Sequence, residues 1–86
     1  MASYKVEISA TAERQLRKLP KDVLRRVVRA LEQLSDDPYP PGSRKLTGWH
    51  DTFRIRIGTH RILYVVHKEI VTIIVLKIGH RKDVYR

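Results

Sequence analysis

Three arginines lie close together in one short stretch, where residues 53–64 read FRIRIGTHRILY. Arg54 and Arg56 alternate with apolar residues, and this period of two predicts a strand with one buried side. A Gly58-Thr59 turn separates them from Arg61, which begins a returning strand, so all three are expected on one side of a β-hairpin. Guanidinium groups this close repel one another, and a bound anion relieves that repulsion. Because their fork geometry fits a phosphodiester, the sequence predicts a phosphate-binding surface.

The last eight residues, GHRKDVYR, add side chains suited to the same chemistry. Arg81 is a further permanent charge, and His80 beside it is a candidate proton acceptor, which an arginine cannot be. Exposure at a turn explains His80 equally well. The histidines do not predict a zinc site, because the chain has no cysteine and no His-x-x-x-His pair. We therefore expect no metal and no other cofactor.

The charge of the chain is unevenly distributed. Residues 1–39 contain eight Lys/Arg and six Asp/Glu, whereas residues 40–86 contain ten and three, and the net charge is +9. This surplus favours a polyanionic partner, and nucleic acid rather than a membrane, although a solubilising charge coat is the alternative. The lack of cysteine, of a signal peptide and of a long apolar run predicts a soluble cytoplasmic protein.

The elements that must position these side chains can be predicted from periodicity. Residues 4–8 alternate as a short strand, and Ser9 or Thr11 can cap a helix that ends before Pro20. Pro20 suits the start of a second helix. That helix has an apolar stripe made of Val23, Val27, Ala30, Leu31 and Leu34. Residues 70–78 form a last strand so apolar that it is expected inside the sheet.

Together these elements predict one α+β domain over residues 1–86, in the order β-α-α-β-β-β. The sheet is expected to be small and mostly antiparallel, with the helical hairpin on one face and a basic surface on the other. Tyr64 alternates with apolar residues and is expected in the core. Trp49 is expected to pack its loop over the sheet, and base stacking is the alternative.

Three stretches in this order resemble the RelE/ParE superfamily of toxins from toxin–antitoxin pairs: Lys45-Leu-x-Gly48, residues 53–64, and residues 78–85, which read IGHRKDVY. The resemblance covers nearly the whole chain and implies a RelE-like, microbial ribonuclease-type fold. The Gly-His-Arg-x-Asp-Val-Tyr ending favours the RelE branch, which cleaves messenger RNA in the ribosomal A site. The ParE branch poisons DNA gyrase instead.

The resemblance also implies catalytic residues, which are Arg54, Arg56, Arg61, Arg81 and Tyr85. The RelE reaction is attack of a ribose 2′-hydroxyl on the adjacent phosphate, which needs a proton acceptor, charge stabilisation and a proton for the leaving oxygen. In the best-known members the residues matching Arg54 and Arg56 are lysines. Because arginine does not deprotonate, removal of the 2′ proton is left to a histidine, to Tyr85, or to substrate and solvent. His80 is the first candidate among the histidines and His60 the second, although exposure at a turn is the preferred explanation for His60.

Partners follow from the same resemblance. Phosphates of ribosomal RNA and of mRNA on the ribosome are expected to contact Arg44, Lys45 and Lys82. A cognate RelB-like antitoxin is expected to form a toxin–antitoxin hetero-oligomer, with an amphipathic helix on the helical hairpin and a segment along the sheet. Two alternatives remain: a ParE-like gyrase inhibitor, and a catalytically weak or silent member that only binds RNA or an antitoxin.

Overall fold

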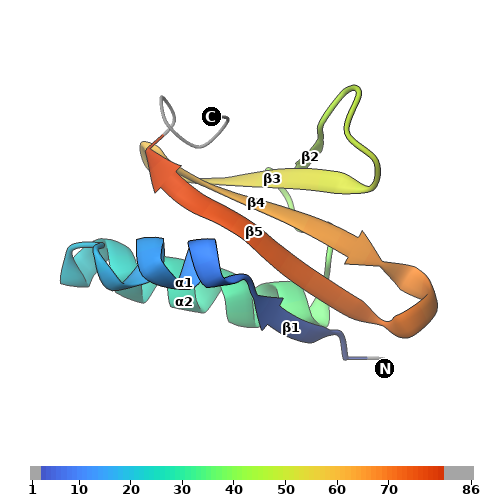
Figure 1. Ribbon diagram of the computed structural model, residues 1–86, viewed down its shortest axis with the longest axis horizontal. Helices are drawn as coiled ribbons and strands as arrows, with labels where there is room; N and C mark the ends of the chain where they lie inside the picture. The colour runs from blue at the N-terminus through green and yellow to red at the C-terminus, as the bar shows by residue number, and fades with distance from the viewer. Residues whose placement is uncertain (1–2, 81–86) are drawn as a thin grey trace.

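The computed structural model describes residues 3–80 of the chain (Figure 1). Its elements in chain order are β1 (Lys5–Ile8), α1 (Ala10–Arg17), α2 (Lys21–Asp36), β2 (Arg44–Lys45), β3 (Thr52–Ile57), β4 (His60–His67), the 3₁₀-helix η1 (Lys68–Ile70) and β5 (Thr72–His80). The predicted α+β class and the predicted order of the longer elements are confirmed. The sequence reading missed β2, because two residues are too few to show a period.

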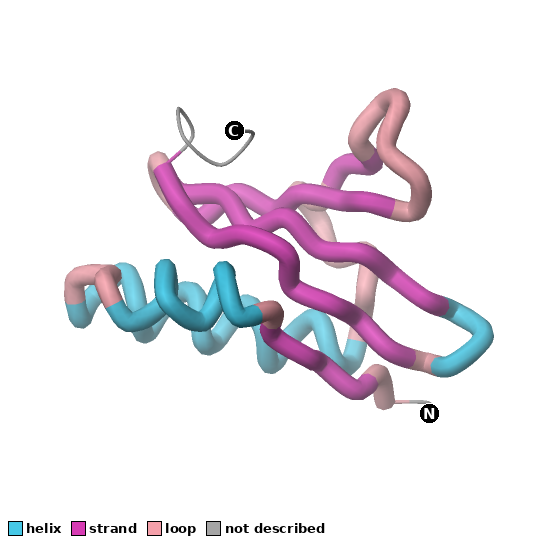
Figure 2. The backbone as a smooth tube through the Cα atoms, in the orientation of Figure 1, coloured by secondary structure: helices cyan, strands magenta, loops and turns pink. Residues whose placement is uncertain are grey.

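The five strands form one sheet in the order β1-β5-β4-β3-β2. β1 runs parallel to β5, and every other neighbouring pair is antiparallel. As predicted from its apolar composition, β5 lies inside the sheet, between β1 and β4. The two helices cover one face only, and the opposite face carries no helix (Figures 1 and 2).

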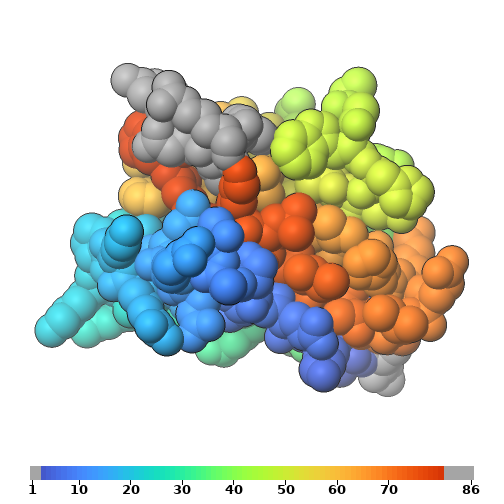
Figure 3. Space-filling model, viewed as in Figure 1, coloured from blue at the N-terminus to red at the C-terminus, as the bar shows by residue number. Residues whose placement is uncertain are grey.

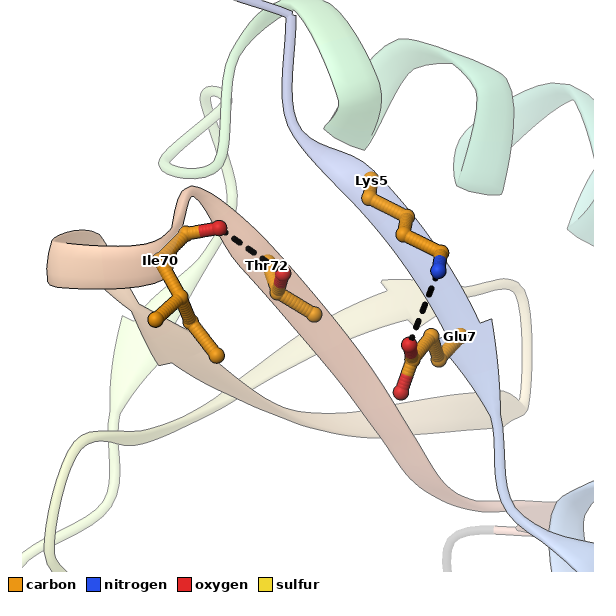
Figure 4. Close-up of polar contacts among 4 residues, drawn as sticks. All are labelled: Lys5, Glu7, Ile70 and Thr72. Atoms are coloured by element: carbon orange, nitrogen blue, oxygen red, sulfur yellow. Dashed lines mark hydrogen bonds and ion pairs between the residues drawn. The ribbon is translucent and has the colours of Figure 1, made fainter.

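The boundaries of the last strand differ from the prediction of residues 70–78. Ile70 ends η1, and Val71 adopts the left-handed conformation with φ of 50° before β5 begins. The Thr72 hydroxyl donates to the Ile70 carbonyl oxygen at 3.0 Å, which closes this corner where β5 passes β1 (Figure 4). Because β5 starts and ends two residues later than expected, Gly79 and His80 belong to the strand and not to a tail.

Ser9 is the cap of α1, which decides between the two predicted candidates. Its hydroxyl oxygen accepts from the Ala12 backbone N–H at 3.0 Å and donates to the Leu76 carbonyl at 2.9 Å, so it joins the helix to β5. Two residues further along β5, the Gln15 side-chain oxygen accepts from the Ile78 N–H at 2.7 Å. Pro20 precedes α2 as its N-cap. These bonds fix α1 against the sheet.

The core fills the space between the helices and the sheet. The predicted apolar stripe of α2 faces inward, with Val27 and Leu34 fully buried, and meets residues such as Ile55, Ile62 and Val75. Tyr64 is also fully buried, as predicted, and its hydroxyl donates to the Pro38 carbonyl at 2.8 Å. Burial raises the pKa of Tyr64 to about 12. Within residues 3–80, no helix is long and apolar enough to cross a bilayer.

Candidate nucleic-acid interface

The register of the hairpin assigns each arginine to a side of the sheet. Ile55 lies opposite Ile62, and both belong to the core under the helices. Since side chains alternate along a strand, the side chains of Arg54 and Arg56 project from the face of the sheet that carries no helix. Arg61 lies directly opposite Arg56 and leaves the same side.

The neighbouring strands extend this set of cations. In β2, Arg44 lies opposite Arg54, and in β5, Lys77 lies opposite Leu63, which itself lies opposite Arg54. We call this side of the sheet the arginine face, and its cations are Arg44, Arg54, Arg56, Arg61 and Lys77. Strands β3, β4 and β5 contain no acidic residue. The face therefore carries a concentrated positive charge, as phosphate binding requires.

The arginines are not equally accessible. Arg56 is exposed and Arg61 is half-buried, but Arg54 is only 7% exposed, so the three arginines share one side of the sheet but differ in their access to solvent. Arg54 and Arg61 each already have an interaction partner. Within residues 3–80, no carboxylate forms a salt bridge with Arg56. Arg56 is thus the arginine of the hairpin most open to a ligand.

Lys77 is the site residue that the sequence reading missed. Ile73 and Val75 point into the core, and strict alternation would send Lys77 there as well. The register between β4 and β5 shifts at this point, because Leu63 pairs with Lys77 whereas Tyr64 pairs with Val75. This bulge turns Lys77 to the arginine face and lets Ile78 return to the core. The only signal in the sequence was a single charge in an otherwise apolar strand.

The loop between β2 and β3 does not behave as predicted. Trp49 is 44% exposed, which is more than expected of a side chain that packs the loop over the sheet. The loop instead surrounds an open hollow of about 480 Å³ that is lined by residues 45–50. Lys45 lies opposite Phe53, so its side chain starts from the side of the sheet opposite the arginine face, yet Lys45 also lines this hollow.

The register separates the histidine candidates from the arginine face. His60 lies opposite both Ile57 and His80, and its ring centroid is 6.0 Å from that of His80. Ile57 packs against the core, so the side chains of both histidines project from the face of the sheet that the helices cover. The structure therefore does not bring His80 together with Arg56 and Arg61.

Three further candidates, Arg81, Lys82 and Tyr85, lie outside the described residues. Among residues 3–80, no group of three or more His, Asp or Glu side chains is arranged to hold a metal ion. The described part of the candidate site is therefore a set of cations on a sheet face, beside a loop that exposes a tryptophan.

Comparison with known proteins identifies the family. Residues 6–85 match the model of the ParE toxin of type II toxin–antitoxin systems. The chain belongs to this family, and the resemblance to the RelE/ParE superfamily is confirmed.

Individual relatives bear RelE-type names. Toxin RelG of Mycobacterium tuberculosis is 41% identical over 87 residues, which cover 96% of this chain and 97% of the relative. The toxin–antitoxin complex RelBE2 from the same species contains a chain with a TM-score of 0.79 and 37% identity, over 92% of this chain and 99% of that one. A chain of the archaeal RelE–RelB complex from Pyrococcus horikoshii matches with a TM-score of 0.83 and 30% identity, and the match covers 94% of this chain and 98% of that one.

Proposed function

We propose that this toxin is a ribosome-dependent mRNA endoribonuclease of the RelE type, which stops translation in the cytoplasm by cleaving messages in the A site. The observation that carries the proposal is the directly opposed Arg56–Arg61 pair on a sheet face whose three long strands lack acidic residues. Two like charges opposite each other destabilise a hairpin. Binding of a phosphate between them offsets this repulsion and uses the fork geometry of both groups.

The proposed reaction uses these cations for charge stabilisation and needs no metal. The ribose 2′-oxygen attacks the adjacent phosphorus, the bond from phosphorus to the 5′-oxygen of the next nucleotide breaks, and the products are a 2′,3′-cyclic phosphate and a 5′-hydroxyl. Negative charge increases on the five-coordinate phosphorus, where Arg56, Arg61 and Arg54 are proposed to stabilise it together with Arg81. Arg44, Lys45, Lys77 and Lys82 are proposed to hold the flanking phosphates.

The proton of the 2′-hydroxyl needs an acceptor that no arginine provides. We assign the acceptor or positioning role to Tyr85 rather than to His80, because β5 directs His80 to the other side of the sheet. The leaving 5′-oxygen takes its proton from solvent or from the group that accepted the first one. This assignment makes Tyr85 and His80 separable by mutation.

A cognate antitoxin of the RelB type is proposed to hold the toxin inactive as a hetero-oligomer. An apolar groove of about 370 Å³ runs between β1 and the helices, lined by Val6, Ile8, Leu16, Val28, Leu31, Glu32 and Ser35. Ile8 and Val28 remain exposed there, at 39% and 40%. Relatives in several solved structures are bound to RelB-type antitoxins. An amphipathic antitoxin segment in this groove, followed by an acidic segment on the arginine face, would block RNA.

A ParE-like gyrase inhibitor is the second candidate, because the matching family model bears the ParE name. Primer extension on a reporter mRNA after brief induction, with purified gyrase assayed in parallel, separates the two. Cuts within translated codons that disappear when the start codon is removed support the proposal. Intact mRNA with inhibited gyrase assigns the chain to the ParE type, and neither effect indicates a silent binder.

A further inference from the structure

We propose that the loop between β2 and β3, residues 46–51, is a binding site for an unpaired nucleobase of an RNA chain, with the indole of Trp49 as the stacking surface. The inference rests on RNA as the ligand in the proposed function, but it does not require cleavage. It assigns a binding role to a part of the molecule that the phosphate chemistry leaves unused.

The shape of the loop suits a flat ligand. The loop rises from the sheet on the side away from the helices and projects from the body of the molecule (Figures 2 and 3). Residues 45–50 line an open hollow of about 480 Å³, and Trp49 is one of its walls. This volume is within the range of small-ligand sites and exceeds what one base requires.

Hydrogen bonds order the backbone of the loop that carries Trp49. The Leu46 N–H donates to the Thr52 carbonyl at 2.9 Å and closes the base of the loop. The Trp49 N–H donates to the Leu46 carbonyl at 3.3 Å, and Gly48 between them has a φ of 81°, as the third position of a type II turn requires. The Thr52 hydroxyl also donates to the His50 carbonyl at 2.9 Å. A loop whose backbone is already ordered loses less entropy when a base stacks on its aromatic side chain.

The charges around the loop favour RNA over an apolar partner. Lys45 lines the hollow, and its neighbour Arg44 lies opposite Arg54 on the arginine face. A strand whose phosphates follow the arginine face can therefore continue past Arg44 to Lys45 while one base turns into the hollow. The single carboxylate of the loop, on Asp51, is 3.0 Å from His50 Nε2. Aromatic stacking combined with a cationic path is the usual way in which proteins hold single-stranded RNA.

The stacking selects unpaired bases but not a particular base, because every base has a π face. The loop would thus position the strand beside the arginine face and add affinity without fixing the sequence. The competing occupant is a segment of an antitoxin, and the test below distinguishes it.

Trp49 is the only tryptophan of the chain, so fluorescence excited at wavelengths where its four tyrosines do not absorb reports on this site alone. The isolated full-length toxin would be titrated with a 2′-O-methyl oligonucleotide that it cannot cleave, and with the same backbone carrying abasic sites. Fluorescence polarisation of end-labelled probes measures affinity independently. We expect the base-carrying probe to quench Trp49 and to bind roughly tenfold more tightly than the abasic probe.

Three variants make the test specific. Trp49→Leu should remove the roughly tenfold advantage of the base-carrying probe and leave abasic binding unchanged, and Trp49→Phe should restore part of the advantage. Arg56→Ala should weaken both probes and keep their difference. The inference is overturned if the wild type binds both probes equally, binds without quenching, or binds neither probe. It is also overturned if the antitoxin quenches Trp49 and RNA does not. Quenching by RNA in a protein that never cleaves mRNA would overturn the proposed function and leave the base site intact.

Discussion

Arg56 and Arg61 lie directly opposite each other in the β3–β4 hairpin, on the side of the sheet that the helices leave open. Like charges in directly opposed positions destabilise a strand pair. The two-residue turn of Gly58 and Thr59 leaves no freedom to slip them apart, since a shift of one residue would reverse the faces of the whole strand. An anionic ligand bound to both guanidinium groups would therefore lessen the repulsion between them.

The first prediction concerns the balance between activity and stability at this pair. Arg56→Gln and Arg61→Gln should each lower mRNA cleavage by about 10² to 10³-fold, because each removes a charge that stabilises the transition state. Arg56→Gln should not lower the thermal midpoint, since it also removes the repulsion, whereas Arg61→Gln additionally loses the interaction that Arg61 makes and can lower the midpoint. Cleavage on purified ribosomes and thermal unfolding measure the two effects. Lys21→Gln, an equal charge change on the exposed start of α2, is the control and should alter neither. Wild-type cleavage by both variants would refute the assignment.

The second prediction tests the side chain that the bulge redirects. Lys77→Met should weaken cleavage and RNA binding roughly tenfold, because it removes a cation from the arginine face. Lys77→Arg keeps the charge and should restore binding. If Lys77→Arg restores binding but not cleavage, the ammonium group of Lys77 takes part in the chemical step, and the assignment of proton transfer to Tyr85 would have to be given up. Unchanged binding by Lys77→Met would show that RNA does not reach this part of β5.

The third prediction separates the two proton-transfer candidates. His80→Gln and His60→Gln should keep cleavage within about threefold of wild type, because both side chains project from the face of the sheet opposite the arginine face. Tyr85→Phe should lower cleavage by about 10² or more if the phenol positions or accepts the 2′ proton. Single-turnover cleavage across pH 6 to 9 measures both. A large loss in His80→Gln, with an acidic limb missing from its pH profile, would return the proton-transfer role to His80.

Much of the fold follows from the periodicity of the sequence alone. The alternation of Phe53, Ile55 and Ile57 with arginines was enough to place the hairpin, and the stripe of α2 was enough to place the core. Periodicity fails where the period changes, and it therefore could not show that Lys77 reaches the arginine face.

The site was harder to predict than the fold, because exposure depends on neighbours that are distant in sequence. Arg54 and Arg56 are equivalent by alternation, yet Arg54 is 7% exposed and Arg56 is exposed. Likewise, no local pattern tells whether Trp49 covers the sheet or faces solvent. The face of His80 depended on where β5 ends, and strand ends are the least certain part of a sequence prediction.

The fourth prediction concerns the buried phenol of Tyr64. Tyr64→Phe should lower the free energy of unfolding by about 1 kcal/mol at neutral pH, because it leaves the Pro38 carbonyl without its 2.8 Å donor. Denaturant unfolding measures this loss. Tyr39→Phe is the matched control, since Tyr39 is 38% exposed, and it should change little.

The same side chain predicts a pH dependence at alkaline pH. Burial raises the pKa of Tyr64 from 10.0 to about 12, so the folded state holds the phenolic proton more tightly than the unfolded chain. The contribution of this group is fully present below pH 10 and is lost as the pH rises toward 12. Tyr64→Phe should therefore show a shallower loss of stability over this interval. An identical slope in both proteins would contradict the raised pKa.

The fifth prediction concerns the turn that sets the register of the opposed arginines. Gly58 has a φ of 60°, whereas Thr59 is not among the residues with positive φ, which fits a type II′ turn with glycine in the first central position. A Cβ at Gly58 would also lie 3.4 Å from the Arg26 guanidinium of α2.

Gly58→Ala should therefore destabilise the fold by about 1 to 2 kcal/mol, because an L side chain is strained in this backbone conformation. For a domain of this size, such a loss corresponds to a decrease in the thermal midpoint of roughly 4 to 8 °C for each kcal/mol. Thr59, the other residue of the turn, has no positive φ, so Thr59→Ala should lower the free energy of unfolding much less. The length of the turn, and not the glycine itself, orients Arg56 and Arg61. At temperatures below the thermal midpoint of the variant, cleavage by Gly58→Ala should therefore remain close to that of the wild type. A folded Gly58→Ala protein without cleavage would mean that the turn itself contacts the RNA.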